Sequence, residues 1–174
     1  MSTPEKLKSL VRDVPGYPQP GIIFRDITPL LGDRAAFKDA VELMSRAWTD
    51  PVPDLVAAIE ARGFIPGSAI AVKLGAGFVP IRKTGKLPWS TIAESYQLEY
   101  GTDQLEVHAD AVRPGQKVLI VDDVLATGGT AAAAVRLMRK LGADVIGVQV
   151  LIELAYLNGR ERLPDVRLMS EIVY

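Results

Sequence analysis

The stretch that most constrains the fold of this chain runs from Val118 to Thr130 and reads VLIVDDVLATGGT. Its first four residues, Val118 to Val121, are all aliphatic and do not alternate with polar residues, which is typical of a parallel strand buried on both faces. Two carboxylates follow at the predicted carboxyl end of this strand. A helix is then predicted over residues 131–141, with Gly142 as its stop. The order of strand, turn and helix predicts a βαβ unit of an α/β fold.

The turn between this strand and this helix has the chemistry of an anion site. Its small residues allow several backbone N–H groups to face one anion, the helix start adds partial positive charge, and Thr127 and Thr130 offer hydroxyls. Asp122 and Asp123 would repel an anion but can accept hydrogen bonds from neighbouring sugar hydroxyls. The pattern therefore predicts a ribose 5-phosphate site, although Asp-Asp before Gly-Gly also occurs in ordinary turns. A nucleoside triphosphate P-loop is excluded because no Gly-Lys-Ser/Thr follows.

Further strands and helices alternate along the rest of the chain, which predicts a mostly parallel sheet with right-handed crossovers. The predicted strands span residues 55–59, 77–81 and 145–152, and the predicted helices span residues 34–48 and 65–74. Ligands of such sheets bind beyond the carboxyl ends of the strands. We therefore expect one common rim at the strand ends, formed by Glu60, Arg82, Asp122 and Glu153.

Two segments interrupt this alternation. Residues 5–13 could form a short helix, and the prolines and glycine that follow, up to Gly21, impose an extended path, so this region is expected to be a lid rather than a sheet. Residues 89–100 and 104–108 read as the arms of a hairpin. We expect a single domain over residues 1–174, with an N-terminal hood of about residues 1–33 and a flexible flap of about residues 83–108.

The composition narrows the possible partners. The 174 residues carry a formal net charge of -1 with both signs interspersed, so the chain lacks the basic excess that supports nucleic-acid binding. It has no cysteine and no apolar run long enough to span a bilayer. These features predict a cytoplasmic protein that acts on small molecules, with no nucleic acid and no membrane as partners.

The stretch from Val118 to Thr130 resembles the signature of the type I phosphoribosyltransferases, and further matches extend over nearly the whole chain. These matches are Pro20–Pro29, Glu60–Phe64, Arg82–Pro88 and Leu98–Gly101. The resemblance implies a mostly parallel central sheet flanked by helices, with a small N-terminal hood and a hairpin flap. Members of the family that use guanine or hypoxanthine usually have an acid where this chain has Ala126 and often a lysine where it has Gly129, so adenine is the expected base.

The resemblance also implies an activity: transfer of the 5-phosphoribosyl group from 5-phospho-α-D-ribose 1-diphosphate to adenine, giving AMP and pyrophosphate, a purine-salvage reaction. It implies Mg²⁺ held mainly by substrate and water, with no dedicated protein ligands, and a homodimer. Glu99 is implied as the catalytic residue, close to N7 of the purine. The implied phosphoribosyl-binding residues are Asp122, Asp123, Ala126, Thr127, Gly128, Gly129 and Thr130. The implied pyrophosphate-binding residues are Arg62, Arg82, Lys83 and Lys86. The implied adenine-binding residues are Ile23, Phe24, Arg25, Val124 and Leu154.

Most of these residues have a simpler explanation when taken alone. Arg62 could be an exposed loop arginine, the basic residues 82–86 a solvated turn, and Glu99 an exposed strand residue. Ala61 stands where many relatives have serine, which removes one hydroxyl from the pyrophosphate loop. Two rival functions stay open: a phosphoribosyltransferase for another base, such as xanthine or hypoxanthine, and a regulator that uses the same fold to sense phosphoribosyl diphosphate and bind nucleic acid.

Overall fold

The computed structural model describes residues 3–97 and 102–174, without the side chain of Gln97. The chain divides into two compact units, Met1–Leu43 and Met44–Tyr174. The rim of predicted strand ends falls in the larger unit, so that unit carries most of the candidate site.

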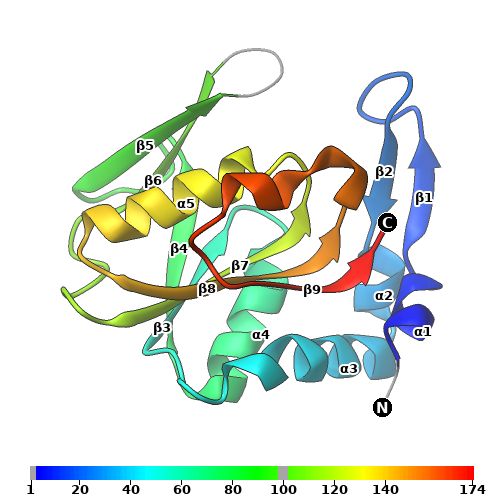
Figure 1. Ribbon diagram of the computed structural model, residues 1–174, viewed down its shortest axis with the longest axis horizontal. Helices are drawn as coiled ribbons and strands as arrows, with labels where there is room; N and C mark the ends of the chain where they lie inside the picture. The colour runs from blue at the N-terminus through cyan, green and yellow to red at the C-terminus, as the bar shows by residue number, and fades with distance from the viewer. Residues whose placement is uncertain (1–2, 98–101) are drawn as a thin grey trace. The chain divides into compact units, whose positions relative to one another are not determined.

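A seven-stranded sheet forms the centre of the larger unit, in the order β5-β6-β4-β3-β7-β8-β9 (Figure 1). Its parallel part pairs β3 with β4 and β7, β7 with β8, and β8 with β9, while β6 runs antiparallel to β4 and β5. The strands are β3 (Leu55–Ile59), β4 (Gly77–Lys83), β5 (Thr91–Gln97), β6 (Thr102–His108), β7 (Lys117–Leu125), β8 (Asp144–Glu153) and β9 (Leu168–Val173). This arrangement confirms the predicted mostly parallel α/β sheet.

Two helices cover the sheet: α4 (Phe64–Leu74) connects β3 to β4, and α5 (Gly129–Lys140) connects β7 to β8. These crossovers run toward opposite edges of the sheet, so right-handed connections place α4 and α5 on opposite faces, as Figure 1 shows. The alanines of α5, including the fully buried Ala133 and Ala134, let this helix lie close to the sheet. Two short 3₁₀ turns, η2 (Ala155–Leu157) and η3 (Gly159–Arg162), follow β8.

Strand β7 is longer than the sequence predicted. Asp122 and Asp123 lie within it, because Val124 and Leu125 continue the parallel pairing with β8 as partners of Ile152 and Glu153. The expectation that both carboxylates lie beyond the strand end was therefore wrong. Since successive residues of a strand point to opposite faces, the two aspartates leave the backbone in different directions.

The hairpin pairs as predicted within the described residues, from Thr91 opposite His108 to Gln97 opposite Thr102. Strand β9 was not predicted, nor were the 3₁₀ turns before it. The expected mobility of the hairpin stays a prediction.

The smaller unit contains a sheet where the sequence predicted only a lid. Its elements are α1 (Pro4–Lys8), β1 (Arg12–Pro15), β2 (Ile23–Asp26), α2 (Thr28–Gly32) and the start of α3 (Arg34–Ser45), which η1 (Arg46–Trp48) follows. Strands β1 and β2 pair antiparallel, with Val14 opposite Phe24. Gly16 and Gly21, both with positive φ, turn the chain between them. The predicted helix over residues 5–13 is shorter because β1 begins at Arg12.

Candidate active site

The loop Ala126–Thr130 forms a cavity of about 80 Å³ at the start of α5. Gly128 has a φ of 80°, and a Cβ at this position would lie 2.3 Å from the carbonyl oxygen of Gly159. Only glycine therefore allows the loop to pack against η3. The first N–H groups of a helix have no intrahelical acceptor, so the start of α5 offers donors to an anion in this cavity.

The paired acids on β7 lie beside this loop. The side chain of Asp123 is 8% exposed, and its Oδ2 lies 2.7 Å from Nε of Arg62. The backbone N–H of Asp123 donates to Oδ1 of Asp122 at 2.8 Å. Burial, and then the negative charge of Asp123, raise the pKa of Asp122 well above its ordinary value. A ligand that donates hydroxyl hydrogens to these carboxylates would relieve part of this unfavourable charge.

The loop after β3 brings Arg62 to the acids. A Cβ on Gly63 would lie 2.5 Å from the carbonyl oxygen of Ile59 and 2.8 Å from Oδ1 of Asp122, so this loop touches β7 through a residue that must be small. The Glu60–Ala61 peptide bond in the same loop is cis. The sequence predicted Arg62 on a loop just beyond a buried strand, and the structure puts its guanidinium against the acid pair.

Glu60 binds the basic residues of the next strand. Its carboxylate accepts hydrogen bonds from Nη2 of Arg82 at 3.0 Å, from Nζ of Lys86 at 2.9 Å and from the backbone N–H of Lys83 at 3.0 Å. Burial acts to raise the pKa of Glu60, but the hydrogen bonds from Arg82 and Lys86 outweigh it and lower the pKa to about 2. Sequence reasoning gave Glu60 no role, although its place at a strand end on the predicted rim was a usable signal.

The hairpin supplies the last wall of the site. Nζ of Lys83 lies 2.9 Å from Oδ2 of Asp103, which also accepts a hydrogen bond of 3.2 Å from the hydroxyl of Tyr96. The hydrogen bond to Asp103 raises the pKa of Lys83 above its ordinary value. Neither Tyr96 nor Asp103 was predicted as a site residue, because their contact depends on the strand pairing.

These walls enclose a second cavity of about 430 Å³, which shares Asp122 and Thr130 with the loop cavity. The two cavities therefore form one continuous site at the carboxyl ends of β3, β4 and β7. Its further lining residues include Glu60, Arg62, Lys83, Tyr96, Asp103 and Asp123. The structure thus brings the predicted phosphoribosyl-binding residues together with Arg62 and Lys83, while Arg82 and Lys86 reach this site only through Glu60.

The predicted adenine-binding residues fall in both units. Ile23, Phe24 and Arg25 lie on β2 in the smaller unit, where the ring of Phe24 packs edge-on against Tyr17 at 5.2 Å. Val124 lines the loop cavity in the larger unit, and Leu154 directly follows β8. The adenine slot stays a prediction, and Glu99 lies outside the residues that the structure describes.

In the described ranges 3–97 and 102–174, no three histidine, aspartate or glutamate side chains are arranged to hold a metal ion. Within the same ranges, no helix is long and apolar enough to cross a membrane.

The fold is that of a phosphoribosyltransferase, and comparison with known proteins agrees. Residues 32–172 match the sequence model of the phosphoribosyl transferase domain. The chain therefore belongs to the phosphoribosyltransferase family, and its most similar relatives place it among the adenine phosphoribosyltransferases of that family.

Similar proteins cover nearly the whole chain. The adenine phosphoribosyltransferase of Thermotoga neapolitana is 60% identical over 97% of this chain and 99% of its own length. The crystal structure of the Rhodothermus marinus adenine phosphoribosyltransferase has a TM-score of 0.95 at 50% identity and covers 98% of each chain. The Saccharomyces cerevisiae enzyme, solved with an imino-altritol bisphosphate and adenine, has a TM-score of 0.91 at 36% identity and covers 97% of this chain and 98% of its own.

Proposed function

We propose that this protein transfers the 5-phosphoribosyl group of 5-phospho-α-D-ribose 1-diphosphate to adenine, releasing pyrophosphate and forming AMP in purine salvage. One observation carries this proposal: the phosphate loop Ala126–Thr130, the paired acids Asp122 and Asp123, and the cations Arg62 and Lys83 line a single site. Relatives that cover almost the whole chain carry the name adenine phosphoribosyltransferase.

The phosphoribosyl group binds between the loop and the acids. Backbone N–H groups of Ala126–Thr130, with the hydroxyls of Thr127 and Thr130, hold the 5′-phosphate. Asp122 and Asp123 accept hydrogen bonds from the ribose hydroxyls. Because both ends of the sugar are held, its C1 is oriented for attack by the base.

Pyrophosphate binds on the opposite wall, through Arg62, Arg82, Lys83 and Lys86. Each of these cations pairs with a carboxylate of the protein: Asp123 for Arg62, Asp103 for Lys83, and Glu60 for the other two. Pyrophosphate must therefore replace carboxylates as the partner of these side chains. Arginine suits this exchange because its planar guanidinium matches phosphate oxygens with two parallel hydrogen bonds.

The residues proposed to bind adenine are Ile23, Phe24 and Arg25 on β2, and Val124 and Leu154 in the larger unit. A backbone N–H and C=O pair on β2 can recognise the N1 acceptor and the 6-amino donor of the base. Glu99 manages the proton at N7, where a carboxylate can act as general base or acid. Closure of the flap, about residues 83–108, keeps water from the reacting sugar.

Breaking the bond from C1 to pyrophosphate places positive charge on the sugar ring and negative charge on the leaving group. The cations of the pyrophosphate wall stabilise that negative charge, as cationic clamps do for other phosphates. The pair Asp122 and Asp123 lies on the ribose side, where negative charge favours the cationic ring.

A magnesium ion fits this site in a supporting role. Magnesium takes oxygen ligands and keeps several waters, and the cavity places the carboxylates of Asp122 and Asp123 beside space for the oxygens of the donor. The ion would be held mainly by the donor and water. When bound, it would neutralise charge on the pyrophosphate group.

We infer that the chain acts as one domain, residues 1–174, with a hood of about residues 1–33, and as a homodimer in the cytoplasm. Helix α4 supports the dimer, because it carries a single charged residue, Lys73, and exposes apolar side chains beside Ser68 and Lys73. Val72 and Ile65 of this helix are 84% and 42% exposed, and Phe78 of the following strand is 40% exposed. Exposed apolar surface of this kind marks interaction sites.

The direct test measures release of pyrophosphate with each common nucleobase in turn. We expect turnover with adenine and little or none with hypoxanthine, guanine or xanthine. Faster turnover with one of those bases would show that this base, and not adenine, is the preferred substrate. Absence of turnover with every base, together with salt-dependent DNA binding, would favour the regulator instead.

A further inference from the structure

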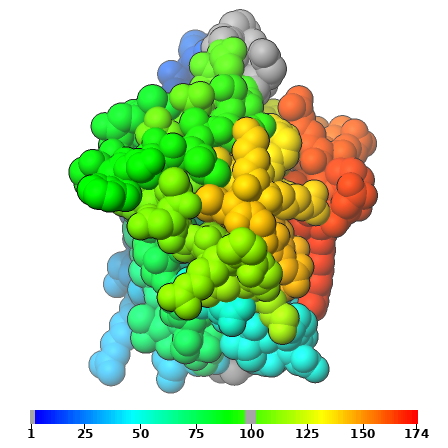
Figure 2. Space-filling view, turned by 90° about the vertical axis from the view of Figure 1, so that its left-hand side faces the viewer, coloured from blue at the N-terminus to red at the C-terminus, as the bar shows by residue number. Residues whose placement is uncertain are grey.

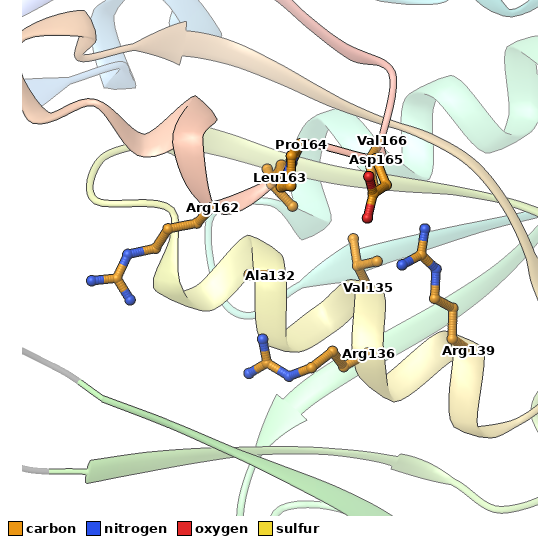
Figure 3. Close-up of a pocket in the computed structure, with 9 residues that line it drawn as sticks. All are labelled: Ala132, Val135, Arg136, Arg139, Arg162, Leu163, Pro164, Asp165 and Val166. Carbon is orange, nitrogen blue, oxygen red and sulfur yellow. The ribbon is translucent and has the colours of Figure 1, made fainter.

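A groove with three arginines runs along the outer side of α5, away from the acid pair. Its first part is a cavity of about 190 Å³ (Figure 3). Arg136 and Arg139 of α5 line this cavity, together with Arg162 at the end of η3. A second cavity of about 380 Å³ shares Ala132, Arg136 and Arg162 with the first. The two cavities are therefore parts of one groove.

The groove has an excess of positive charge. Arg136 lies 2.6 Å from a carboxylate oxygen of Glu94 on β5, and Lys140 lies 2.5 Å from the other oxygen of the same side chain. One carboxylate thus serves two cations. Figure 2 shows the face of the molecule on which the hairpin lies next to α5.

Arg139 and Arg162 have no such carboxylate. Among the residues that the structure describes, neither guanidinium forms a hydrogen bond or an ion pair. Asp165 lines the same cavity, but in the described part of the chain it is not within ion-pair distance of either arginine. The three arginines that line the groove, set against Glu94 and Asp165, leave it positive on a chain whose net charge is -1.

The walls of the groove suit a ligand with a phosphate group. Figure 3 shows Arg162 and Arg136 extending toward the same side from different elements, whereas Arg139 extends the other way, toward Asp165. Leu163, Pro164 and Val166 form an apolar wall beside them, which limits solvent screening of the charges. At the other end, the hydroxyl-bearing residues Ser95 and Tyr96 line the groove on the hairpin side.

We propose that this groove is a second anion site, which binds the phosphate group of a small phosphorylated molecule through Arg136 and Arg162, with Arg139 adding positive charge at the other end of the groove. It is separate from the active site, because among the described lining residues it shares only Gly129 with the loop cavity and Tyr96 with the larger cavity. Both sites can therefore be filled at once. The occupant is small, because the two cavities together offer space for a metabolite rather than for a polymer strand.

The test titrates the full chain with inorganic phosphate while saturating AMP fills the loop, and measures bound phosphate by equilibrium dialysis at constant ionic strength. The test variant is Arg139→Gln with Arg162→Gln. Its matched control is Arg34→Gln with Arg113→Gln, which removes the same charge from exposed positions elsewhere. A third variant, Arg139→Lys with Arg162→Lys, keeps the charge and guards against a folding defect.

We expect the wild type and the control to bind phosphate in addition to AMP, and the test variant to bind it about ten-fold more weakly. The lysine variant should bind it within about three-fold of the wild type, because lysine still binds phosphate as a point charge. AMP affinity should be the same in all four proteins. The proposal is overturned if the AMP-saturated wild type binds no phosphate, or if the test variant and the control lose affinity equally.

Discussion

The two walls of the active site are built from different groups, and the difference indicates how each wall meets its ligand. The phosphate loop offers backbone N–H groups that the start of α5 holds in place, and Gly128 fixes this geometry through its contact with Gly159. The pyrophosphate wall offers charged side chains, each already paired with a carboxylate. The N–H groups of the loop can bind a phosphate without rearrangement, whereas the cations of the pyrophosphate wall must first leave their carboxylates.

This contrast matches the order of events in the proposed reaction. The 5′-phosphate stays bound from donor to product, and a preformed site serves that purpose at low entropic cost. Pyrophosphate has to leave, and carboxylates that return to Arg62, Arg82, Lys83 and Lys86 favour its departure. The predictions below change one wall and leave the other intact, except the last, which changes the acid pair between them.

The largest effect is expected for Arg62→Gln, which removes the guanidinium from the exchanging wall and leaves the buried Asp123 without its cation. Steady-state kinetics should show kcat/KM for the donor reduced by about 10²- to 10³-fold. AMP affinity should change far less, because the phosphate loop is untouched. The control is Arg113→Gln, which changes an exposed arginine elsewhere in the chain. An equal loss of kcat/KM in the control would show that Arg62 has no specific role in binding the donor.

The next largest effect is expected for Gly128→Ala, which damages the preformed wall. The new methyl group would meet the carbonyl oxygen of Gly159 at 2.3 Å, so the loop must move. AMP should bind about 100-fold more weakly by calorimetry, a loss of about 2.7 kcal/mol. Gly115→Ala is a matched control, because Gly115 has a φ of 83° but nothing lies within 4 Å of the place that its new methyl group would take. If both variants keep AMP affinity, the loop does not hold the phosphate.

A smaller effect, of opposite sign, is expected for Glu60→Gln. Without the carboxylate that competes for Arg82 and Lys86, pyrophosphate should bind about ten-fold more tightly. Competition assays against the donor would measure this affinity. Weaker binding of pyrophosphate would show that Glu60 positions the cations for the ligand rather than competing with it.

The pH dependence of the stability of Glu60→Gln tests the ion pairs of Glu60. The pKa of Glu60 is about 2 in the folded protein and 4.5 in its ordinary state, so the charge of Glu60 stabilises the fold above pH 4.5. That contribution is lost as the pH falls toward 2. Chemical denaturation should therefore find the wild type more stable than Glu60→Gln at neutral pH, with the difference shrinking over this range.

The smallest effect is expected for Asp122→Asn. Because burial and the charge of Asp123 raise the pKa of Asp122, ionising it costs stability once the pH rises above 3.8, the ordinary value. The asparagine variant should melt about 2–4 °C higher than the wild type at neutral pH. The difference should vanish in acid, where the wild-type carboxyl is protonated. A lower melting temperature at neutral pH would mean that the charge of Asp122 is stabilising.

The sequence predicted the parallel sheet because its aliphatic runs, such as Val118 to Val121, do not alternate and are separated by helical segments. It failed for β1 and β2, where prolines and glycines between short strands suggested a lid. Local patterns cannot reveal that two such strands pair, because the pairing depends on residues on both sides of the turn.

The candidate site shows the same division. Arg62, Asp122, Asp123 and the loop were predictable because each lies at or near the end of a buried strand. The partners of these residues were not predictable. Glu60 contacts Arg82 from a separate segment of the chain, and Tyr96 contacts Asp103 across the hairpin. Ion pairing in three dimensions leaves no periodic pattern in one dimension.

A crystal structure of the protein with AMP would test the central claim most directly. The account predicts that the phosphate of AMP lies within hydrogen-bond distance of the backbone N–H groups of Gly128, Gly129 and Thr130, with the ribose hydroxyls against Asp122 and Asp123. An AMP molecule whose phosphate lies on the arginines of the α5 groove, with the loop empty, would contradict it.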